Sequence, residues 1–146
     1  MTTIYVLNGP NLGRLGTREP EVYGSETLED IAAELCASVP ADVELVVRQS
    51  DDEAELIRWI HEAVDRRAPV VLNPAAFTHY SYGLRDAAAQ LTSAGVPLIE
   101  VHLSNPHTRE AFRHTSVISG VATGVIAGFG SGSYRLAIEH LLRSRG

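Results

Sequence analysis

Short apolar runs recur along the chain, and longer segments with a helical period separate them. The apolar runs span residues 4–7, 43–48, 70–73, 98–103 and 121–127, and each predicts a β-strand. The intervening segments predict helices over residues 28–39, 53–64, 84–91, 109–112 and 134–143. Apolar strands that alternate with helices are typical of a parallel sheet covered on both faces. The pattern therefore predicts an α/β fold.

The same periodicity predicts which residues face inward. In the second helix, Ile57, Ile60 and Val64 form the expected inner face. Ser50 and Glu53 match the capping box, in which the first residue caps the helix and the second reaches back. In the third helix the expected inner face consists of Leu84, Ala87, Ala88 and Leu91.

Right-handed crossovers leave few topologies for five such strands, and we predict the flavodoxin-like order 2-1-3-4-5. In that order a crevice lies beyond the carboxyl ends of strands 1 and 3. Polar segments gather there: residues 9–26 follow the first strand, 73–79 the third, and 102–105 the fourth. The first segment is longer than an ordinary connection, which indicates a lid or a binding loop. No repeat or linker divides the chain, so we expect one domain over residues 1–146.

Composition and charge argue against several classes of protein. The 146 residues are 45% hydrophobic and 21% charged, which argues against disorder. The formal net charge of −6 disfavours a nucleic-acid partner, although a few converging arginines can still bind a small anion. Cys36 is the single cysteine, so we expect neither an intrachain disulfide nor a zinc knuckle. Its place on the apolar face of the first helix predicts a buried side chain.

No segment predicts export or membrane insertion. The opening residues have no basic region and too short an apolar run for a signal peptide, and no apolar stretch approaches membrane-spanning length. We therefore expect a cytoplasmic protein with no membrane partner. No metal site is expected either, because the spacing of a metal-ligand set is missing among His61, His107, His114 and His140.

Glu100 and His102 lie two positions apart in the fourth strand, so their side chains share one face. A carboxylate inside a sheet strand needs a partner. Glu100 can hold His102 in one tautomer and raise its proton affinity, as carboxylates do for catalytic imidazoles. The alternatives are a structural ion pair, which also perturbs pKa values, and an edge strand with one solvated face. Their position at the carboxyl end of a strand favours catalysis.

Tyr23 ends the long opening loop, five positions after Arg18. A tyrosine is a poor base at its ordinary pKa of about 10, but a nearby guanidinium favours the phenolate and lowers that pKa. The alternative is a packed lid tyrosine beside a solvated arginine, and the spacing alone does not decide between them. We interpret the remaining tyrosines as packing or interface residues: Tyr5, Tyr80, Tyr82 and Tyr134.

Residues after the third and fourth strands are suited to binding an anion. Leu103 and Ser104 can offer a backbone N–H and a hydroxyl to a carboxylate. Asn73 and His79 can add neutral hydrogen bonds.

Two further features have more ordinary interpretations. Arg109 and Arg113 are four positions apart and share a helix face, which is most often a solvated basic surface. Residues 124–132 are rich in glycine but lack the lysine of a phosphate-binding loop, so we interpret them as tight packing or a helix cap.

Several motifs, in their order along the chain, resemble those of the type II dehydroquinases: LNGPNLGRLGTREPEVYG, RQSDDEAELIRWIHEA, LNPAAFTHYS, LRDA, EVHLSNPHTREAFRHTSVIS and ATGVIAGFG. The resemblance covers nearly the whole chain. It implies a flavodoxin-like fold, no metal or cofactor, and trimers that assemble into a dodecamer. It also implies a hydro-lyase that dehydrates 3-dehydroquinate to 3-dehydroshikimate through an enolate, in the shikimate pathway or in quinate catabolism.

The resemblance implies a catalytic role for five residues. Tyr23 matches the base, and Arg18 matches the arginine that activates it. Asn11 matches the asparagine that stabilises the enolate through a bound water. His102 matches the general acid on the leaving hydroxyl, oriented by Glu100.

Other matching residues imply contacts with the substrate or its surroundings. The implied contacts with the substrate carboxylate and hydroxyl are Asn73, Leu103 (by its backbone) and Ser104, and those with the ring hydroxyls are His79 and Arg113. Arg14 and Arg109 match charged residues at the margin of the site. Asp86 matches an aspartate that reaches the site of the neighbouring subunit.

Three positions depart from the family pattern. Tyr80 stands where a threonine is usual, which is expected to alter the pocket or a subunit contact. Ser133 replaces a glycine, and a glycine with positive φ would require a local change of backbone. Asp51 stands where asparagine is common. None of the three is expected to touch a proposed catalytic group.

Other functions fit the same crevice less well. A flavin or nucleotide binder needs a compact loop rich in Ser, Thr and Gly after the first strand, whereas this loop carries Arg and Asn. A receiver-like signalling module needs acidic residues where Asn8 and Asn73 stand. A scaffold that has lost catalysis would not keep a complete set of catalytic groups. We also expect residues 13–21 to be poorly ordered, or to differ between subunits, without ligand.

Overall fold

The protein is built on one parallel sheet. The structure, a computed structural model, describes residues 1–17, 21 and 25–145. The sheet has five strands in the order β2-β1-β3-β4-β5, and every neighbouring pair is parallel. The strands are β1 (Thr2–Asn8), β2 (Val43–Gln49), β3 (Val70–Asn73), β4 (Leu98–His102) and β5 (Gly124–Ala127). The predicted α/β class and strand order are therefore confirmed.

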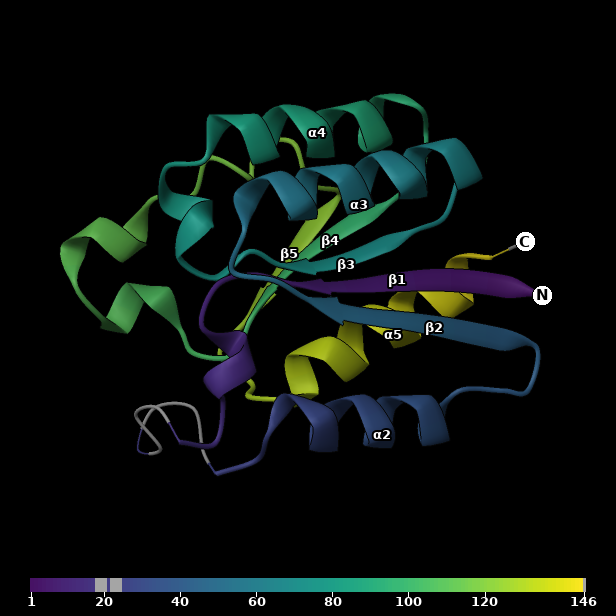
Figure 1. Cartoon of the computed structure of the whole chain (residues 1–146), viewed down its shortest axis with the longest axis horizontal. Helices are drawn as coiled ribbons and strands as arrows, with labels where there is room; N and C mark the ends of the chain where they lie inside the picture. The colour runs from purple at the N-terminus through teal and green to yellow at the C-terminus, as the bar shows by residue number, and fades with distance from the viewer. Residues whose placement is uncertain (18–20, 22–24, 146) are drawn as a thin grey trace.

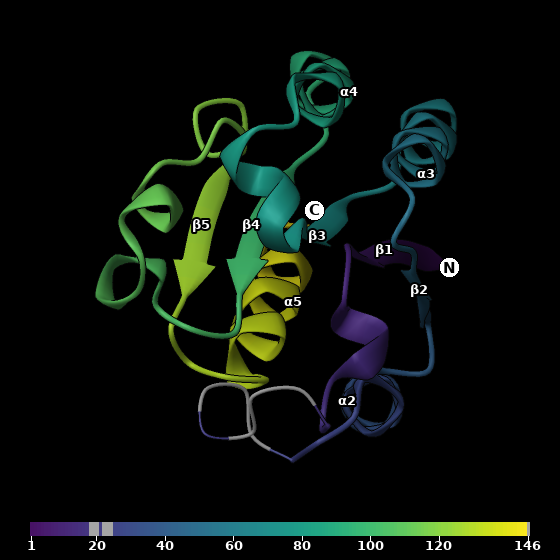
Figure 2. The same cartoon turned by 60° about the vertical axis from the view of Figure 1, so that its left-hand side comes forward.

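In the described part of the chain, four α-helices cover the sheet, two on each face (Figure 1). One face carries α3 (Glu53–Arg66) and α4 (Tyr82–Ser93), and the other carries α2 (Leu28–Ser38) and α5 (Gly132–Ser144). Figure 2 turns the carboxyl ends of the strands towards the viewer and shows the two helix layers above and below the sheet. No helix within the described residues is long and apolar enough to cross a membrane.

The alternation of side chains along β1 divides the core into two halves. Tyr5 and Leu7 are buried among side chains of α3 and α4, whereas Ile4 and Val6 are buried on the side of α2 and α5. Both faces of a central strand are therefore apolar, which explains why the strand reads as a continuous hydrophobic run.

The inner face of α4 agrees with the periodicity, and that of α3 is wider than predicted. Leu56, Ile60 and Ala63 are the buried residues of α3, while the predicted Ile57 and Val64 are half-buried and pack against the same core cluster. The reason is that α3 packs against both the sheet and α4, which widens its apolar stripe beyond one face. In α4 the buried residues are the predicted Leu84, Ala87, Ala88 and Leu91.

The predicted capping box at the start of α3 is wrong. Asp52 is the cap, and its carboxylate accepts a hydrogen bond of 2.9 Å from the Ala54 N–H. Ser50 instead accepts 2.9 Å from the Asp52 N–H, one step before the helix. Glu53 accepts from the Ser81 hydroxyl, which ties the beginnings of α3 and α4 together. Asp52 is the cap because it lies two positions after Ser50 and immediately before the first helical residue.

Cys36 is exposed, so its predicted burial is wrong. The buried residues of α2 are Ile31 and Leu35, and the position after Leu35 turns about 100° away from the sheet. A capping box does occur in this helix, between Thr27 and Asp30, with both hydrogen bonds at 3.1 Å.

The segments on either side of β5 differ in detail from the sequence prediction. The helix expected over residues 109–112 is replaced by two 3-10 turns, η3 (Pro106–Thr108) and η4 (Ala111–His114). The fifth strand is shorter than predicted and begins at Gly124. Ser133 lies in the first turn of α5 without positive φ, so this position requires no glycine-like backbone.

The ends of β1 and β3 approach closely just after the paired residues. The N–H of Gly9 donates 2.8 Å to the carbonyl of Asn73. A Cβ at Gly9 would lie 2.6 Å from the carbonyl oxygen of Pro74, well inside contact distance. Glycine at this position therefore allows the two chain segments to meet.

We predict that Gly9→Ala forces this crossing apart and lowers the free energy of unfolding by about 1–3 kcal/mol. Gly120→Ala is the matched control, since a Cβ there meets nothing within 4 Å and φ is not positive. Urea denaturation of both variants measures the difference. Equal stability of the two variants would contradict the close approach.

We also predict that Leu56→Ala costs about 2–5 kcal/mol of unfolding free energy because its side chain is fully buried. Ile57→Ala should cost clearly less, because Ile57 is only half-buried. The same denaturation experiment compares them, and a larger loss for Ile57→Ala would contradict the orientation of α3.

Candidate active site

A crevice opens at the carboxyl ends of β1, β3 and β4, at the edge that the topology predicted. Each strand and the turns that follow contribute to it. The lining residues are Pro10, Asn11, Leu12, Asn73, Ala75, Ala76, His79, His102, Leu103, Ser104, Pro106, Arg109 and Arg113. Eight of them were predicted as site residues from the sequence: Asn11, Asn73, His79, His102, Leu103, Ser104, Arg109 and Arg113.

Asn11 is held by its backbone at the mouth of the crevice. Its φ of 70° is in the left-handed region, where asparagine is one of the few residues found with little penalty. Its N–H donates 2.9 Å to Asp51, and Gln49 donates 3.1 Å to the same carboxylate oxygen. The expectation that the departure at Asp51 touches no catalytic group is therefore wrong. Either aspartate or asparagine offers the required acceptor oxygen.

Asn73 is fixed from behind by a buried tyrosine. The Tyr134 hydroxyl donates 2.5 Å to Asn8 Oδ1 and accepts 2.9 Å from Asn73 Nδ2. Asn73 Oδ1 accepts 3.1 Å from the Ala75 N–H. Burial raises the pKa of the Tyr134 hydroxyl above its ordinary value, so the proton that it donates stays in place. The orientation of the Asn73 amide is thereby determined by its neighbours.

Glu100 and His102 form the pair that the sequence predicted. Nε2 of His102 lies 2.5 Å from Oε2 of Glu100, and the Glu100 residue is only 1% exposed. Leu98, Glu100 and His102 share the face covered by α3 and α4, as alternation along β4 requires. His102 reaches the crevice, whereas Glu100 lies behind it.

The carboxyl group of Glu100 is ionised at neutral pH in spite of its burial. Burial alone raises its pKa, but hydrogen bonds and charge from His102, together with hydrogen bonds from Ser119 and Thr78, hold the pKa below its ordinary value. An anion behind His102 stabilises an imidazolium that faces the crevice. Because the folded-state pKa is lowered, this group stabilises the fold above an unfolded pKa of about 4.3, and the contribution is lost as pH falls through the folded value.

His79 faces the crevice from η2 (Ala75–His79). Its Nδ1 lies 2.8 Å from the carbonyl oxygen of Thr115. A carbonyl only accepts, so Nδ1 carries the proton and Nε2 is left to interact in the crevice. The Phe112 ring stands edge-on to the imidazole, with centroids 5.6 Å apart, and restricts its rotation.

The two arginines predicted as a pair reach the crevice from the turns after β4. Arg113 donates 2.8 Å from Nε to Glu110, and its side chain is only 16% exposed. Arg109 Nη1 lies 3.4 Å from the Ser104 hydroxyl, which also lines the crevice. The two arginines therefore do not form an ordinary solvated basic surface. Both guanidinium groups instead add positive charge to the same side of the crevice.

Some predicted site residues do not line the crevice. Asp86 lies on α4 with a side chain that is 68% exposed and forms an ion pair of 2.8 Å with Arg85. Arg14 borders a neighbouring groove between residues 13–17, α2 and β2. Arg18 and Tyr23 lie outside the described residues. The lid expected over residues 13–21 falls partly on the same residues and stays a prediction.

Sequence reasoning missed several residues of the crevice. No chemical signal marks Ala75, yet its φ of 50° places it in a region that alanine rarely adopts. Its N–H contacts Asn73, so this unusual backbone contributes to the geometry of the site. The remaining lining residues that were not predicted are Pro10, Leu12, Ala76 and Pro106.

Two histidines that were separate in the sequence come together near the crevice. The rings of His107 and His114 have centroids 5.8 Å apart. Across residues 1–17, 21 and 25–145, no group of three His, Cys, Asp or Glu side chains is arranged to hold a metal ion. Tyr80 is 58% exposed and does not line the crevice, so its effect on the pocket is not direct.

Together these groups suit proton transfer on a small anion. The carboxylate behind His102 supports a proton donor, the arginines attract negative charge, and the neutral amides of Asn11 and Asn73 can hydrogen-bond oxygen atoms. Water elimination from a hydroxylated carboxylic acid needs such a set.

Comparison with known proteins places the chain in a family. The family model described as Dehydroquinase class II matches residues 2–142. The 3-dehydroquinate dehydratase of Salinispora tropica is 60% identical over 140 residues, covering 94% of this chain and 95% of the relative. The 3-dehydroquinate dehydratase 2 of Pseudomonas aeruginosa is 56% identical over 140 residues, covering 94% and 92%.

A solved structure agrees with the sequence relatives. The crystal structure of the type II dehydroquinase from Propionibacterium acnes has a TM-score of 0.93 at 49% identity, covering 99% of this chain and 98% of that one. The chain belongs to the class II dehydroquinase family.

Proposed function

We propose that this protein dehydrates 3-dehydroquinate to 3-dehydroshikimate, as a hydro-lyase of the shikimate pathway. The observation that carries the proposal is the buried Glu100–His102 pair, which opens on a crevice lined by two arginines. The close relationship to proteins named 3-dehydroquinate dehydratase supports it. A catabolic role in the breakdown of quinate uses the same reaction and the same groups.

The reaction begins with removal of a proton beside the substrate ketone. Tyr23 is the proposed base, and Arg18 favours its phenolate form. The electron pair of the broken C–H bond moves into an enolate, whose oxygen is stabilised by Asn11 through a water molecule. The left-handed backbone of Asn11, fixed by Asp51, supports this role because it presents the side chain at the crevice.

The second step expels the hydroxyl group as water. His102 gives a proton to the leaving oxygen, the C–O bond breaks, and the enolate electrons form the new double bond conjugated with the ketone. The Glu100 carboxylate stabilises the imidazolium before this transfer. No electrons pass to an acceptor, so we propose that the reaction proceeds without a cofactor.

Substrate binding is assigned to the remaining polar groups of the crevice. The carboxylate and a hydroxyl are held by Asn73, Ser104 and the backbone of Leu103. The ring hydroxyls contact His79 and Arg113, and Arg109 supplies charge at the margin. The side chains reach the crevice from the ends of separate strands, which suits a compact ring with polar groups on its edge.

We further propose a cytoplasmic homo-oligomer in which trimers assemble into a dodecamer and Asp86 completes the site of a neighbouring subunit. Asp86 does not line the crevice of its own chain and is exposed, which suits a contact across an interface. Tyr80 and Tyr82, at the start of α4, are large exposed side chains of the same region.

The function is tested by mixing the protein with 3-dehydroquinate and following the ultraviolet absorbance of the enone product. The expected result is an increase that depends on protein and substrate concentrations. Folded, assembled protein that gives no signal above buffer would overturn the proposal.

We predict that Tyr23→Phe and Arg18→Ala each lose most of the turnover, by about 100-fold or more, because proton abstraction loses its base or its activator. Circular dichroism should show an unchanged fold. Tyr82→Phe is the control, since it removes a hydroxyl outside the crevice. Near-normal turnover of Tyr23→Phe would rule out the tyrosine as the base.

We predict that Asp86→Ala impairs turnover, whereas Arg85→Ala does not. Both substitutions break the same ion pair, but only the first removes the carboxylate. Mixing unfolded Asp86→Ala and Tyr23→Phe chains and refolding them together should restore activity, because some sites then combine an intact Tyr23 with the Asp86 of a neighbour. No recovery in the refolded, assembled mixture would contradict a shared site.

A further inference from the structure

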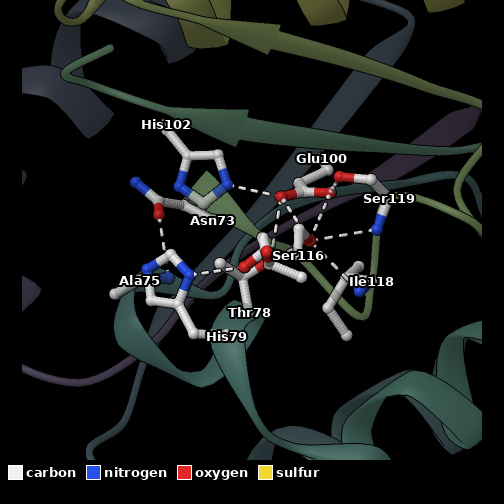
Figure 3. Close-up of polar contacts among 10 residues, drawn as sticks. Asn73, Ala75, Thr78, His79, Glu100, His102, Ser116, Ile118 and Ser119 are labelled. Atoms are coloured by element: carbon white, nitrogen blue, oxygen red, sulfur yellow. Dashed lines mark hydrogen bonds and ion pairs between the residues drawn. The ribbon is translucent and has the colours of Figure 1, made fainter. Parts of the chain in front are cut away.

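The buried carboxylate of Glu100 is surrounded by three hydroxyl groups as well as by His102 (Figure 3). The Ser119 hydroxyl donates 2.6 Å to Oε1, and the Thr78 hydroxyl donates 2.9 Å to Oε2. Ser116 lies between them, with its hydroxyl oxygen 3.2 Å from Oε2 and 2.5 Å from the Thr78 oxygen. Both carboxylate oxygens are therefore occupied without any water.

The hydrogen-bond partners limit where each hydroxyl proton can point. Ser116 accepts 3.1 Å from the N–H groups of both Ile118 and Ser119, so its own proton points towards Thr78 or Glu100. Thr78 uses its proton on Glu100. The hydroxyl protons of Thr78 and Ser119 therefore point towards the carboxylate, and the lowered pKa of Glu100 makes that carboxylate an ionised group that only accepts hydrogen bonds. The ring nitrogen of His102 beside it is consequently an N–H donor, and Nδ1 on the other side of the ring is left for the substrate (Figure 3).

The donors come from two segments that are distant from β4 in the sequence. Thr78 lies in η2, immediately before His79, and the serines lie in residues 115–119, immediately after η4. The Val117 N–H donates 2.7 Å to the Thr78 carbonyl, which joins the two segments. The Thr115 carbonyl meanwhile determines the tautomer of His79. The segment 115–119 thus contacts His79 directly and contacts Glu100, the partner of His102.

We propose that Thr78, Ser116 and Ser119 are positioning residues that hold Glu100 ionised and aimed at His102, so that His102 presents its proton to the crevice. This inference takes the identity of the reaction from the proposed function. The hydrogen bonds around Glu100 are observed independently of that function. None of the three lines the crevice, so each acts through the pair and not on the substrate. Their loss should lower kcat more than it changes KM.

Other charged groups near the pair belong to the crevice. His79 faces it from η2, and Arg109 and Arg113 face it from the turns after β4. Among the described residues, Arg113 is paired with Glu110, and neither arginine donates to Glu100. The ionisation of Glu100 therefore depends on His102 and on the hydroxyls that touch it.

The test compares Thr78→Val, which keeps the shape and removes the hydroxyl, with Thr78→Ser, which keeps the hydroxyl. Ser119→Ala removes the shortest hydroxyl contact. Thr92→Val is the control for the loss of a partly buried threonine hydroxyl, because Thr92 donates 2.9 Å to the Val121 carbonyl away from the crevice. Each variant is assayed with 3-dehydroquinate across a pH range. The His102 ring is titrated by NMR with labelled histidine.

We expect Thr78→Val and Ser119→Ala each to lower kcat by about tenfold, with Thr78→Ser and Thr92→Val close to the wild type. In both of these variants the Glu100–His102 pair should also titrate at a higher pH than in the wild type. The reason is that fewer hydrogen-bond donors then stabilise the Glu100 carboxylate. Unchanged titration and unchanged kcat in folded Thr78→Val and Ser119→Ala would overturn the proposal, as would equal losses in Thr92→Val. The NMR titration needs no substrate, so an inactive wild-type protein with the expected titration shifts would overturn only the proposed function.

Discussion

The buried carboxylate of Glu100 is the constraint on which the site depends. An ionised group inside a sheet costs several kcal/mol unless donors surround it. Here a histidine on the same strand supplies one donor, and hydroxyls from one earlier and one later segment supply the others. The turns that carry these hydroxyls also carry His79 and Arg113. Satisfying one charge therefore fixes the path of the loops that form one wall of the crevice.

The opposite wall follows from the parallel sheet. Parallel strands end at one edge, so the chain emerges from β1, β3 and β4 into a common space. Gly9 permits the segment after β1 to touch the segment after β3, and Asp51 holds the backbone of Asn11 from the end of β2. Apolar layers on both faces keep these ends in register, so the crevice is shaped by the scaffold before any ligand binds.

Features with a regular period were predictable, and features that depend on distant partners were not. The strand order and the face of α4 follow from short apolar runs and helical spacing, and Glu100 and His102 share a face because strands alternate. The inner face of α3 was wider than predicted because this helix packs against both the sheet and α4. The hydroxyls of Thr78 and Ser119 gave no signal, since Thr and Ser are common in turns and nothing local shows that they meet a carboxylate about 20 positions away.

The hydroxyl of Tyr134 has a consequence for the order in which the chain is made. It joins the amide groups of Asn8 and Asn73, and the contact with Asn8 spans 126 positions. A growing chain can pair its first strands on the ribosome, but two buried amides lack their partner until α5 has been synthesised and docked. Closing so long a loop is slow compared with local helix formation. The ends of β1 and β3 are therefore completed late in synthesis, so a chain that stops before α5 leaves its crevice unfinished.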